Sequence, residues 1–306
     1  MGNQPPAELY EPIAYTLSLG GKRIRPLLVI MAAEMFGGDM EEAIYPAIGI
    51  EVFHNFTLVH DDLMDNSPLR RNQPTVHRKW NKNIAILSAD AMMVKAYELV
   101  CKTGSSHLRE VLAVFNSTAL QVCEGQQLDM NYETSLQVSI DQYIRMINLK
   151  TAVLLAGSLK IGALLAGANP EDAKCLYAFG ENMGIAFQLQ DDILDVYGEK
   201  EKFGKEPGRD IVANKKTYLL LKAIELAQAE VSEELTKWIA ASQFDEQKKV
   251  KAIIEIYDSL CIRQLAEQEM MKYYRQGLGS LEKISIGPEK KQDLIAFVQT
   301  LMHRVY

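Results

Sequence analysis

Apolar residues recur at intervals of three and four along almost the whole chain of 306 residues, and they rarely alternate with polar ones. This spacing gathers apolar side chains on one face of a helix, so it predicts an all-α protein. Glycine and proline, which interrupt helices, are sparse at 19 and 10 residues. The predicted helices run over residues 25–36, 41–65, 84–103, 106–132, 140–166, 170–196, 216–229, 245–276 and 288–304.

The segment GANPEDAK carries the plainest helix start. Asn169 is a good N-cap residue, and Pro170 suits the first helical position. The most apolar run, residues 151–168, is interrupted by Lys160 and ends at this cap. We therefore expect a buried helix there rather than a membrane span.

Two connections are long and polar, at residues 66–83 and 198–216. Long polar loops in a compact helical protein are usually functional or disordered. No segment has the composition of a linker between domains. The sequence therefore predicts one all-helical domain over residues 1–306, with 48% hydrophobic residues available for a large core.

The charge and the cysteines narrow the class of protein. A formal net charge of −7 argues against a nucleic-acid partner, which normally requires a basic surface. The four cysteines are widely spaced and form no CxxC pair. The N-terminal residues show no basic and apolar signal pattern, so we expect a cytoplasmic protein with reduced thiols.

Two acidic motifs have the same spacing, and each is followed by a basic loop. Their carboxylates lie at positions i, i+1 and i+4, which are Asp61, Asp62 and Asp65 in the first motif and Asp191, Asp192 and Asp195 in the second. On a helix, positions i and i+4 share a face, so their carboxylates repel unless a cation lies between them. A hard cation such as Mg²⁺ meets this need and can bring phosphate oxygens as its other ligands.

A single motif of this kind could be a solvated helix end, but two copies trailed by cations are hard to explain in that way. If the two helices face each other, six carboxylates can hold several Mg²⁺ ions that bridge to a diphosphate. The diphosphate would then be a leaving group that is stabilised as its charge develops. No Ser-His-Asp or Cys-His arrangement is tied to these motifs.

Together the motifs resemble those of the trans-isoprenyl diphosphate synthases, also called polyprenyl synthetases. The similarity covers nearly the whole chain, in family order: LGGKRIRP (19–26), EVFHNFTLVHDDLMD (51–65), RRNQPTVH (70–77), EGQQLD (124–129), LKTAVL (149–154), FQLQDDILD (187–195) and FGKEPGRDI (203–211). The resemblance implies a single large helical bundle, usually a homodimer, with both acidic motifs facing a central cavity. It also implies a Mg²⁺-dependent prenyltransferase with three ions in each active site.

The resemblance assigns roles to residues. It makes Asp61, Asp65 and Asp191 the metal ligands, while Asp62, Asp192 and Asp195 would tune the metal site, orient its ligands or hydrogen-bond through water. The isopentenyl diphosphate site would contain Lys22, Arg25, His54 and Arg71. The allylic diphosphate site would contain Arg70, Lys150, Lys205 and Lys215. The allylic carbocation would be stabilised by the Thr151 hydroxyl, the Lys150 carbonyl and the Gln188 side-chain oxygen.

The chain departs from the family pattern at a few positions. Asn72 follows the arginine pair, and Asn214 precedes Lys215, where the family usually has glycine. Asparagine tolerates left-handed backbone better than most residues, so both changes are mild. The Ala89-Asp90 pair also replaces a common Gly-Asp.

The residues just before the first motif bear on product length. A prenyl tail that starts at Asp61 and Asp65 should run back along the same helix and meet Phe56 and Thr57, then Phe53. One aromatic residue, a small neighbour and no insertion resemble the enzymes that stop at twenty carbons. Geranylgeranyl diphosphate is therefore the predicted product, with farnesyl diphosphate as the alternative.

Three other protein classes fit the motifs less well. A terpene cyclase shares the helical fold, but its second motif normally carries Asn, Ser or Thr and Glu rather than DDILD. A noncatalytic subunit of a prenyl synthase typically loses aspartates, and none is lost here. A structural metal-binding bundle would not explain the cations beside the motifs.

Overall fold

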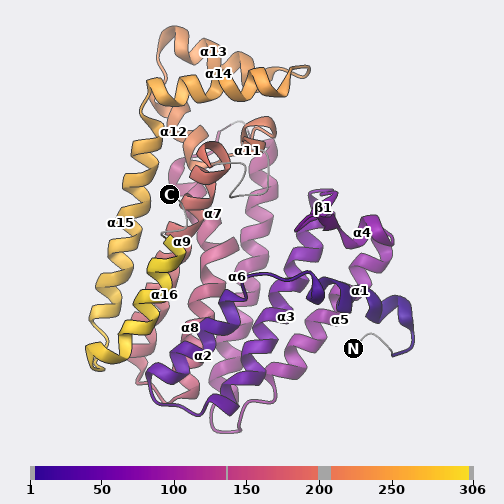
Figure 1. Cartoon of the computed structure of the whole chain (residues 1–306), viewed down its shortest axis with the longest axis vertical. Coiled ribbons are helices and arrows are strands. Elements are labelled where there is room, and N and C mark those ends of the chain that lie inside the picture. Colours follow the sequence, from indigo (N-terminus) through magenta and orange to yellow (C-terminus); the bar gives the residue numbers. More distant parts are fainter. Residues whose placement is uncertain (1–3, 136, 199–207, 303–306) are drawn as a thin grey trace. The chain divides into compact units, whose positions relative to one another are not determined.

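The computed structural model describes residues 4–135, 137–198 and 208–302. These residues are mostly helical, and their only sheet is one two-stranded antiparallel hairpin, which confirms the all-α prediction. In chain order (Figure 1) the elements are α1 (Ala7–Ser18), α2 (Ile24–Met35), α3 (Met40–Met64), β1 (Leu69–Arg70), β2 (Gln73–Pro74), α4 (Val76–Lys79), α5 (Lys82–Val100), α6 (Leu108–Thr134), α7 (Ile140–Ile147), the π-helix η1 (Asn148–Ala152), α8 (Val153–Leu165), α9 (Pro170–Tyr197), α11 (Arg209–Val212), α12 (Tyr218–Leu226), α13 (Ala229–Ala240), α14 (Glu246–Ser259), α15 (Ile262–Glu282), the 3₁₀-helix η2 (Pro288–Lys291) and α16 (Gln292–Met302).

Side-chain caps fix the starts of two long helices, α9 and α3. The Asn169 carboxamide oxygen accepts from the backbone N–H of Asp172 at 2.9 Å, and Pro170 is the first residue of α9. This confirms the helix start predicted at GANPEDAK. At α3, the Asp39 carboxylate accepts from the backbone N–H of Glu41 at 2.8 Å. Each bond satisfies a backbone donor that the helix itself leaves unpaired.

The described helices form two compact units. The first contains the chain up to Ser117 together with Gly157–Lys174. In it α3 lies beside α5, as Figure 1 shows. Small residues permit this close packing, because a Cβ at Gly49 would lie 2.8 Å from a methyl group of Val100. The packing holds the C-terminal end of α3, which carries the first acidic motif.

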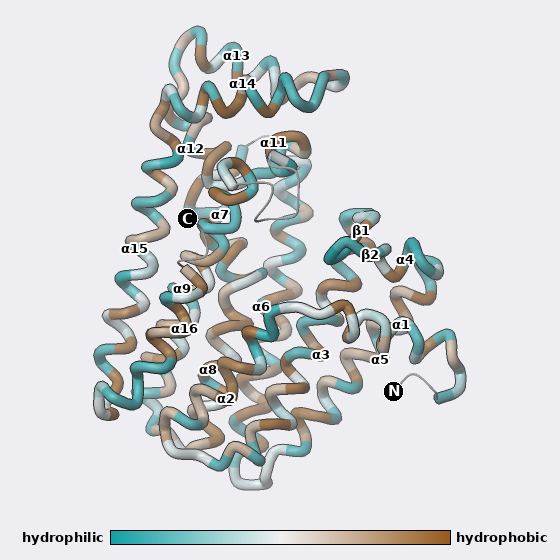
Figure 2. Tube along the Cα trace, in the orientation of Figure 1, coloured by the Kyte–Doolittle hydropathy of each residue, from teal (hydrophilic) through white to brown (hydrophobic). Residues whose placement is uncertain are grey.

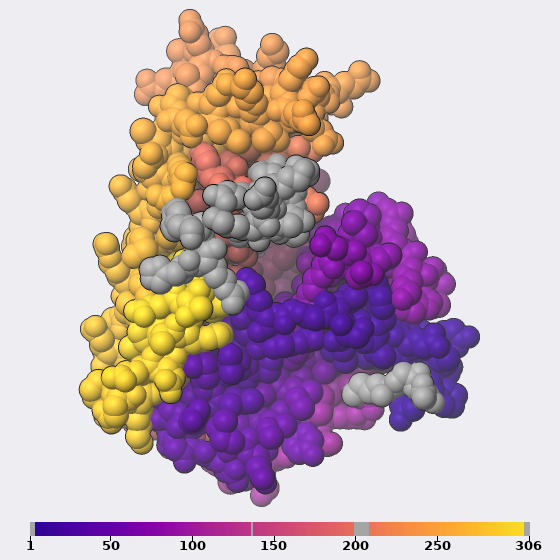
Figure 3. All heavy atoms as spheres, viewed as in Figure 1, coloured from indigo at the N-terminus to yellow at the C-terminus, as the bar shows by residue number. Residues whose placement is uncertain are grey.

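The second unit contains Thr118–Ala156 and the chain from Cys175 onward. Its core is built from side chains of α7, α9, α12, α14 and α15, among them Tyr143, Leu189, Leu219, Tyr257 and Ile262. Along α14 and α15, hydrophobic and hydrophilic residues alternate in Figure 2, as expected for amphipathic helices with one buried face. Most of the remaining side chains of α13 and α14 are at the surface, as Figure 3 shows for part of both helices.

Some elements differ from the sequence prediction. The helix predicted over 245–276 is two helices, because Cys261 adopts a left-handed conformation with φ 54° between α14 and α15. Four short or isolated helices, α1, α4, α11 and α13, were not predicted. The single-domain assignment for residues 1–306 stays a prediction.

The stretch Ile140–Leu165 is long and apolar enough to cross a membrane by length and composition. However, 72% of its most apolar window is buried within the protein, as in the core helix of a soluble protein. It consists of three successive helical segments, α7, η1 and α8.

Candidate active site

The first acidic motif lies at the C-terminal end of α3. Asp61 and Asp62 belong to the last helical turn, and Asp65 is the C-cap residue. The Arg70 guanidinium, on β1, donates to Asp62 at 2.6 and 2.9 Å and to Asp61 at 3.2 Å. Asp62 is buried, which raises its pKa, and the hydrogen bond and charge of Arg70 partly offset this effect. Arg70 therefore acts as counter-ion to two of the three carboxylates.

A tight hairpin places the arginine pair. Strands β1 and β2 are joined by Arg71 and Asn72, with φ of 54° and 61°. A two-residue hairpin turn commonly requires positive φ at both central positions, for which glycine or asparagine is preferred. The predicted tolerance of Asn72 for left-handed backbone is thus confirmed, while Arg71 adopts an unfavourable conformation for a non-glycine residue. The turn directs the two arginines to different partners.

Arg71 lies against the glycines of LGGKRIRP. Its guanidinium donates to the carbonyl of Gly20, and a Cβ added at Gly21 would lie within 3 Å of the guanidinium atoms. Gly21 also has φ of 121°, a conformation that other residues rarely adopt. Gly21 therefore makes room for the arginine.

Arg25 and His54 lie close together in the same unit. An Arg25 guanidinium nitrogen is 3.1 Å from Nε2 of His54. Burial lowers the pKa of His54 far below its usual value, and the charges of Arg25 and Arg71 lower it further. His54 is therefore neutral, and its Nε2 accepts from the guanidinium. Burial also lowers the pKa of Arg25 to about 10.

Two residues that sequence analysis missed complete this cationic group. The Arg23 guanidinium donates to the Glu51 carboxylate and also to the carbonyl of Leu17, the latter at 2.6 Å. Glu51 is buried on α3 and accepts from Asn55 at 2.9 Å. Its negative charge compensates part of the positive charge around it. One signal was available, since Glu51 precedes His54 by three positions and so shares its face of the helix.

Aromatic side chains lie one to two turns before the first motif. The rings of Phe56 and Phe53 are 5.5 Å apart, and Phe53 contacts Phe115 with centroids 5.4 Å apart. Phe53 is fully buried and Phe56 is half-buried. Thr57 donates its hydroxyl to the carbonyl of His54 at 2.8 Å. The three residues predicted to control chain length are therefore neighbours on α3.

In the second unit, Asp192 is the buried carboxylate of the second motif. The Tyr143 hydroxyl and the Gln188 carboxamide donate to it, the latter at 3.1 Å. Burial raises the pKa of Asp192 to about 7, and the charge of Asp210 adds to the shift. Asp191, the neighbouring residue on α9, is exposed. In this motif the Asp191 carboxylate is therefore exposed, whereas the Asp192 carboxylate is held inside the unit.

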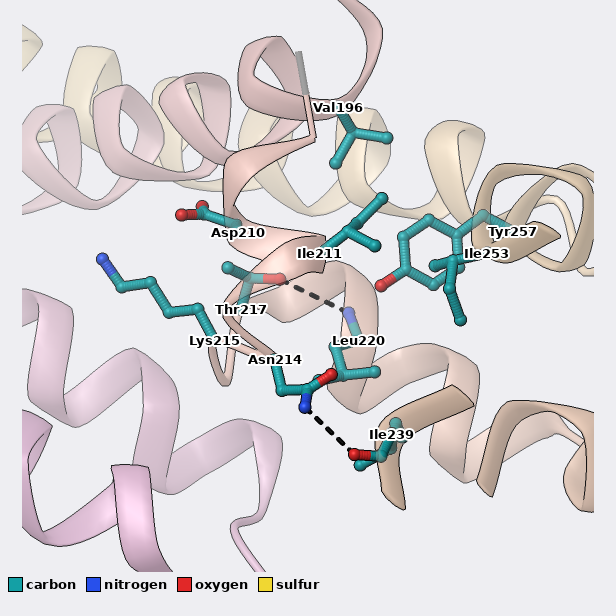
Figure 4. A pocket seen from close by; sticks show the side chains of 10 residues that line it. All are labelled: Val196, Asp210, Ile211, Asn214, Lys215, Thr217, Leu220, Ile239, Ile253 and Tyr257. Atoms are coloured by element: carbon teal, nitrogen blue, oxygen red, sulfur yellow. Dashed lines mark hydrogen bonds between the residues drawn. The ribbon is translucent and has the colours of Figure 1, made fainter. Parts of the chain in front are cut away.

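Asp195 connects the second motif to the loop that follows it. Its carboxylate accepts from the backbone N–H of Asp210 at 2.9 Å, and its carbonyl accepts from Gly208 at 2.5 Å. Figure 4 shows Asp210 and Lys215 on the same side of a small pocket, pointing away from Tyr257. The charge of Lys215 lowers the pKa of Asp192.

The π-helix η1 carries Lys150 and Thr151. Lys150 donates to the Asp129 carboxylate at 2.6 Å, and the Thr151 hydroxyl donates to the Gln188 oxygen at 3.3 Å. Short π-helices often occur at functional sites. The structure therefore brings together Thr151 and Gln188, two of the residues expected to stabilise a carbocation. Asp129 and Tyr143 were missed, although Asp129 ends the EGQQLD motif.

Two glycines permit helices to pack directly against η1. A Cβ at Gly125 of α6 would lie 2.2 Å from the Lys150 backbone nitrogen. One at Gly184 of α9 would lie 2.4 Å from Cα of Ala152. Both distances are far below van der Waals contact, so η1 is held between two backbones with no side chain in between.

The remaining predicted site residues are placed as follows. Lys22 is exposed in the loop before α2, and Asp65 is exposed at the end of α3. Lys205 lies outside the described residues. Within the part that is described, no three His, Cys, Asp or Glu side chains are arranged to hold a metal by themselves.

Comparison with known proteins agrees with this architecture. A family model described as "Polyprenyl synthetase" matches residues 6–257. A short chain isoprenyl diphosphate synthase of Methanothermobacter thermautotrophicus is 37% identical over 278 residues, which is 90% of this chain and 85% of that protein. A geranylgeranyl diphosphate synthase of Methanosarcina mazei is 41% identical over 222 residues, 72% of this chain and 68% of the other.

Solved structures show the same fold. A crystal structure of geranylgeranyl pyrophosphate synthase superimposes with a TM-score of 0.94 at 44% identity, and the match covers 99% of this chain and 94% of the other. The fold is therefore that of the isoprenyl diphosphate synthases, an all-α class of enzyme. The chain belongs to the polyprenyl synthetase family and is a trans-prenyltransferase. The resemblance inferred from the motifs is confirmed.

Proposed function

We propose that this enzyme condenses isopentenyl diphosphate with the allylic diphosphates dimethylallyl, geranyl and farnesyl diphosphate, and that geranylgeranyl diphosphate is the product. The main support is the separation of two kinds of cation in the first unit. Arg70 lies on the carboxylates of the acidic motif, whereas Arg25 and Arg71 form a separate cationic group beside the neutral His54. Two different diphosphates require two such sites, one with metal and one without.

Mg²⁺ would be held by Asp61 and Asp65 of the first motif and by Asp191 of the second, with three ions in each active site. Their chemistry fits, because Mg²⁺ prefers oxygen ligands and usually takes one or two carboxylates together with substrate phosphates. When bound, the metal stabilises the negative charge of the departing diphosphate.

The group around Arg25 would bind isopentenyl diphosphate without metal. The Nε–H of Arg25 is buried and has no hydrogen-bond partner among the described residues. A buried donor of this kind is costly unless an acceptor arrives, and a phosphate oxygen would satisfy it. Lys22 and Arg71 would bind the other phosphate oxygens.

The residues of the second unit would bind the allylic substrate and stabilise its carbocation. Lys150, Lys205 and Lys215, with Arg70, would bind the allylic diphosphate. The Thr151 hydroxyl, the Gln188 oxygen and the Lys150 carbonyl would direct oxygen dipoles at the cation. Asp192 and Asp129 would hold Gln188 and Lys150 in position through the hydrogen bonds described above. The double bond of isopentenyl diphosphate then attacks the cation, and the released diphosphate takes the proton.

The product assignment depends on the aromatic residues before the first motif. Phe56 is followed at 5.5 Å by Phe53, which gives the hydrocarbon tail two successive barriers. Several relatives are geranylgeranyl diphosphate synthases, and this supports a product of twenty carbons. Farnesyl diphosphate is the second candidate, since a farnesyl diphosphate synthase is also among the relatives.

We further expect a homodimer in the cytoplasm. Leu87 and Val94 lie seven residues apart on α5, and so on one side of the helix, and are 61% and 60% exposed. A second subunit would cover them. All four cysteines are free thiols, as is usual in a reducing compartment.

Diphosphate release tests this proposal. The purified chain is incubated with Mg²⁺ and farnesyl diphosphate, with and without isopentenyl diphosphate. A synthase releases diphosphate only when both substrates are present, and the lipid product contains five more carbons. Release from farnesyl diphosphate alone would indicate a terpene cyclase. If neither condition gives release, the two reactions are repeated with geranyl diphosphate: release that needs isopentenyl diphosphate would then indicate a farnesyl diphosphate synthase, and no release would indicate a noncatalytic subunit.

A further inference from the structure

A fully buried lysine lies on α14, away from the acidic motifs. The side chain of Lys249 is inaccessible to solvent. Its ammonium group donates to the Asn214 carboxamide oxygen at 2.7 Å and to the carbonyl of Val212 at 3.3 Å. It also lies 4.1 Å from the centre of the Phe244 ring. Burying an ammonium group costs free energy unless its partners compensate, so these contacts require an explanation.

The partners of Lys249 belong to one short segment. Val212 ends α11, and Asn214 is the residue directly before Lys215. Asn214 has φ of 51° and donates its side-chain amide to the carbonyl of Ile239 at 3.0 Å, as Figure 4 shows. Glycine would supply the same backbone conformation but neither hydrogen bond. The asparagine therefore ties this segment to both α13 and α14.

The other side of the segment is tied to the second acidic motif. The backbone N–H of Lys215 donates to the carbonyl of Asp210 at 2.9 Å. The backbone N–H of Asp210 in turn donates to the Asp195 carboxylate at 2.9 Å. Lys215 is thus held between Asp195, on α9, and the pair of Asn214 and Lys249.

We propose that Lys249 is a positioning residue for Lys215, and that through Asn214 it fixes the lysine that binds the allylic diphosphate. The inference rests on the proposed function, because it assumes that Lys215 binds this substrate. A flexible lysine binds phosphate as a point charge, so its effect depends on where its backbone is held. Displacement by even about 1 Å can weaken such a site strongly.

The alternative is that Lys249 only stabilises the fold. The two roles differ in what they predict for Lys249→Met, which keeps the length of the side chain and removes its charge. Replacing a buried charge by an apolar side chain of similar size is often tolerated or stabilising. A positioning role predicts a selective change in the affinity for one substrate instead.

The test compares Lys249→Met with the control Lys248→Met. Lys248 is the preceding residue of α14 and is exposed, so the control removes the same charge without disturbing Asn214. The KM values for farnesyl diphosphate and isopentenyl diphosphate are measured separately at saturating Mg²⁺, and thermal unfolding is followed for each variant. The KM for farnesyl diphosphate should rise about tenfold in Lys249→Met, which corresponds to about 1.4 kcal/mol. The KM for isopentenyl diphosphate should match that of the control.

A second variant keeps the test decisive if Lys249→Met does not fold. Asn214→Gly retains the left-handed backbone and removes the side chain that connects Lys249 to the segment. It should raise the KM for farnesyl diphosphate in the same selective way. The double variant should show no more than the larger single effect, because both changes break one connection.

Two results would overturn the inference. One is a KM for farnesyl diphosphate in Lys249→Met and Asn214→Gly equal to that of Lys248→Met. The other is an equal rise of both KM values together with a lower melting temperature. If the wild type is active, either result refutes only the positioning role of Lys249 and leaves the proposed function standing. A wild type that is inactive with both substrates refutes the proposed function.

Discussion

Replacing Phe56 by alanine should lengthen the product by one five-carbon unit. Phe56 precedes Asp61 by five residues, which is about 7.5 Å along the helix axis. The next aromatic ring, that of Phe53, lies 5.5 Å beyond it. One isoprene unit adds four bonds to the chain, or about 5 Å in extended form. The space opened by Phe56→Ala therefore accommodates one further unit, and the main product should change from geranylgeranyl to geranylfarnesyl diphosphate.

Phe53 should then stop further growth. Its ring is supported by Phe115, with centroids 5.4 Å apart, and that ring contacts Tyr97 at 5.0 Å. A double variant, Phe56→Ala with Phe53→Ala, should yield still longer chains. Phe56 is half-buried, so its truncation should cost about 2 kcal/mol of folding free energy, below the 3–5 kcal/mol of a fully buried phenylalanine.

The assay is chromatography of the dephosphorylated products from wild type and variants at equal extents of reaction. Phe297→Ala is a matched control, because Phe297 is a half-buried phenylalanine on α16, far along the chain from the motif. It should leave the product distribution unchanged. Identical distributions for wild type and Phe56→Ala would remove Phe56 from this role, and products of many added units would show that Phe53 is no barrier.

Three further predictions concern the site. Asp191→Ala and Asp61→Ala should each reduce Mg²⁺-dependent turnover by about a thousandfold while the melting temperature changes little, because a metal ligand is lost; near-normal turnover of either variant would contradict the metal assignment. Arg71→Ala should raise the KM for isopentenyl diphosphate by about tenfold, and a selective rise for the allylic substrate would mean that the roles of the two adjacent arginines are exchanged. Burial strongly lowers the pKa of His54, so below about pH 6.5 the unfolded chain binds a proton that the folded chain does not, and the free energy of unfolding falls by up to about 1.4 kcal/mol per pH unit. Urea unfolding at pH 7.5 and 5 should therefore show a smaller loss of stability in His54→Gln than in the wild type. An equal loss of stability in both proteins would refute the argument.

The helical periodicity was sufficient to predict most of the fold. The helix that starts at Pro170 was placed correctly because its cap residues are local in sequence. The break at Cys261 was not predictable in this way, since neither glycine nor proline marks it.

In the candidate site too, features with a local sequence signal were predicted, and features that depend on tertiary packing were not. The resemblance grouped Arg25, His54 and Arg71, and the structure shows that their side chains and charges lie close together. Glu51 and Tyr143 were missed because each pairs with a residue on another element, 28 and 49 positions away respectively. Such pairings depend on how helices pack: local spacing places Glu51 on the helix face of His54 but does not show its partner.

The two glycines that flank η1 limit how this enzyme can vary. Side chains that line a hydrocarbon cavity can change size, and the product then changes length. Gly125 and Gly184 have no such freedom, because any side chain there would push the segment of Lys150 and Thr151 out of place. A mutant library that seeks new product lengths should therefore randomise the aromatic positions of α3 and keep these two glycines fixed.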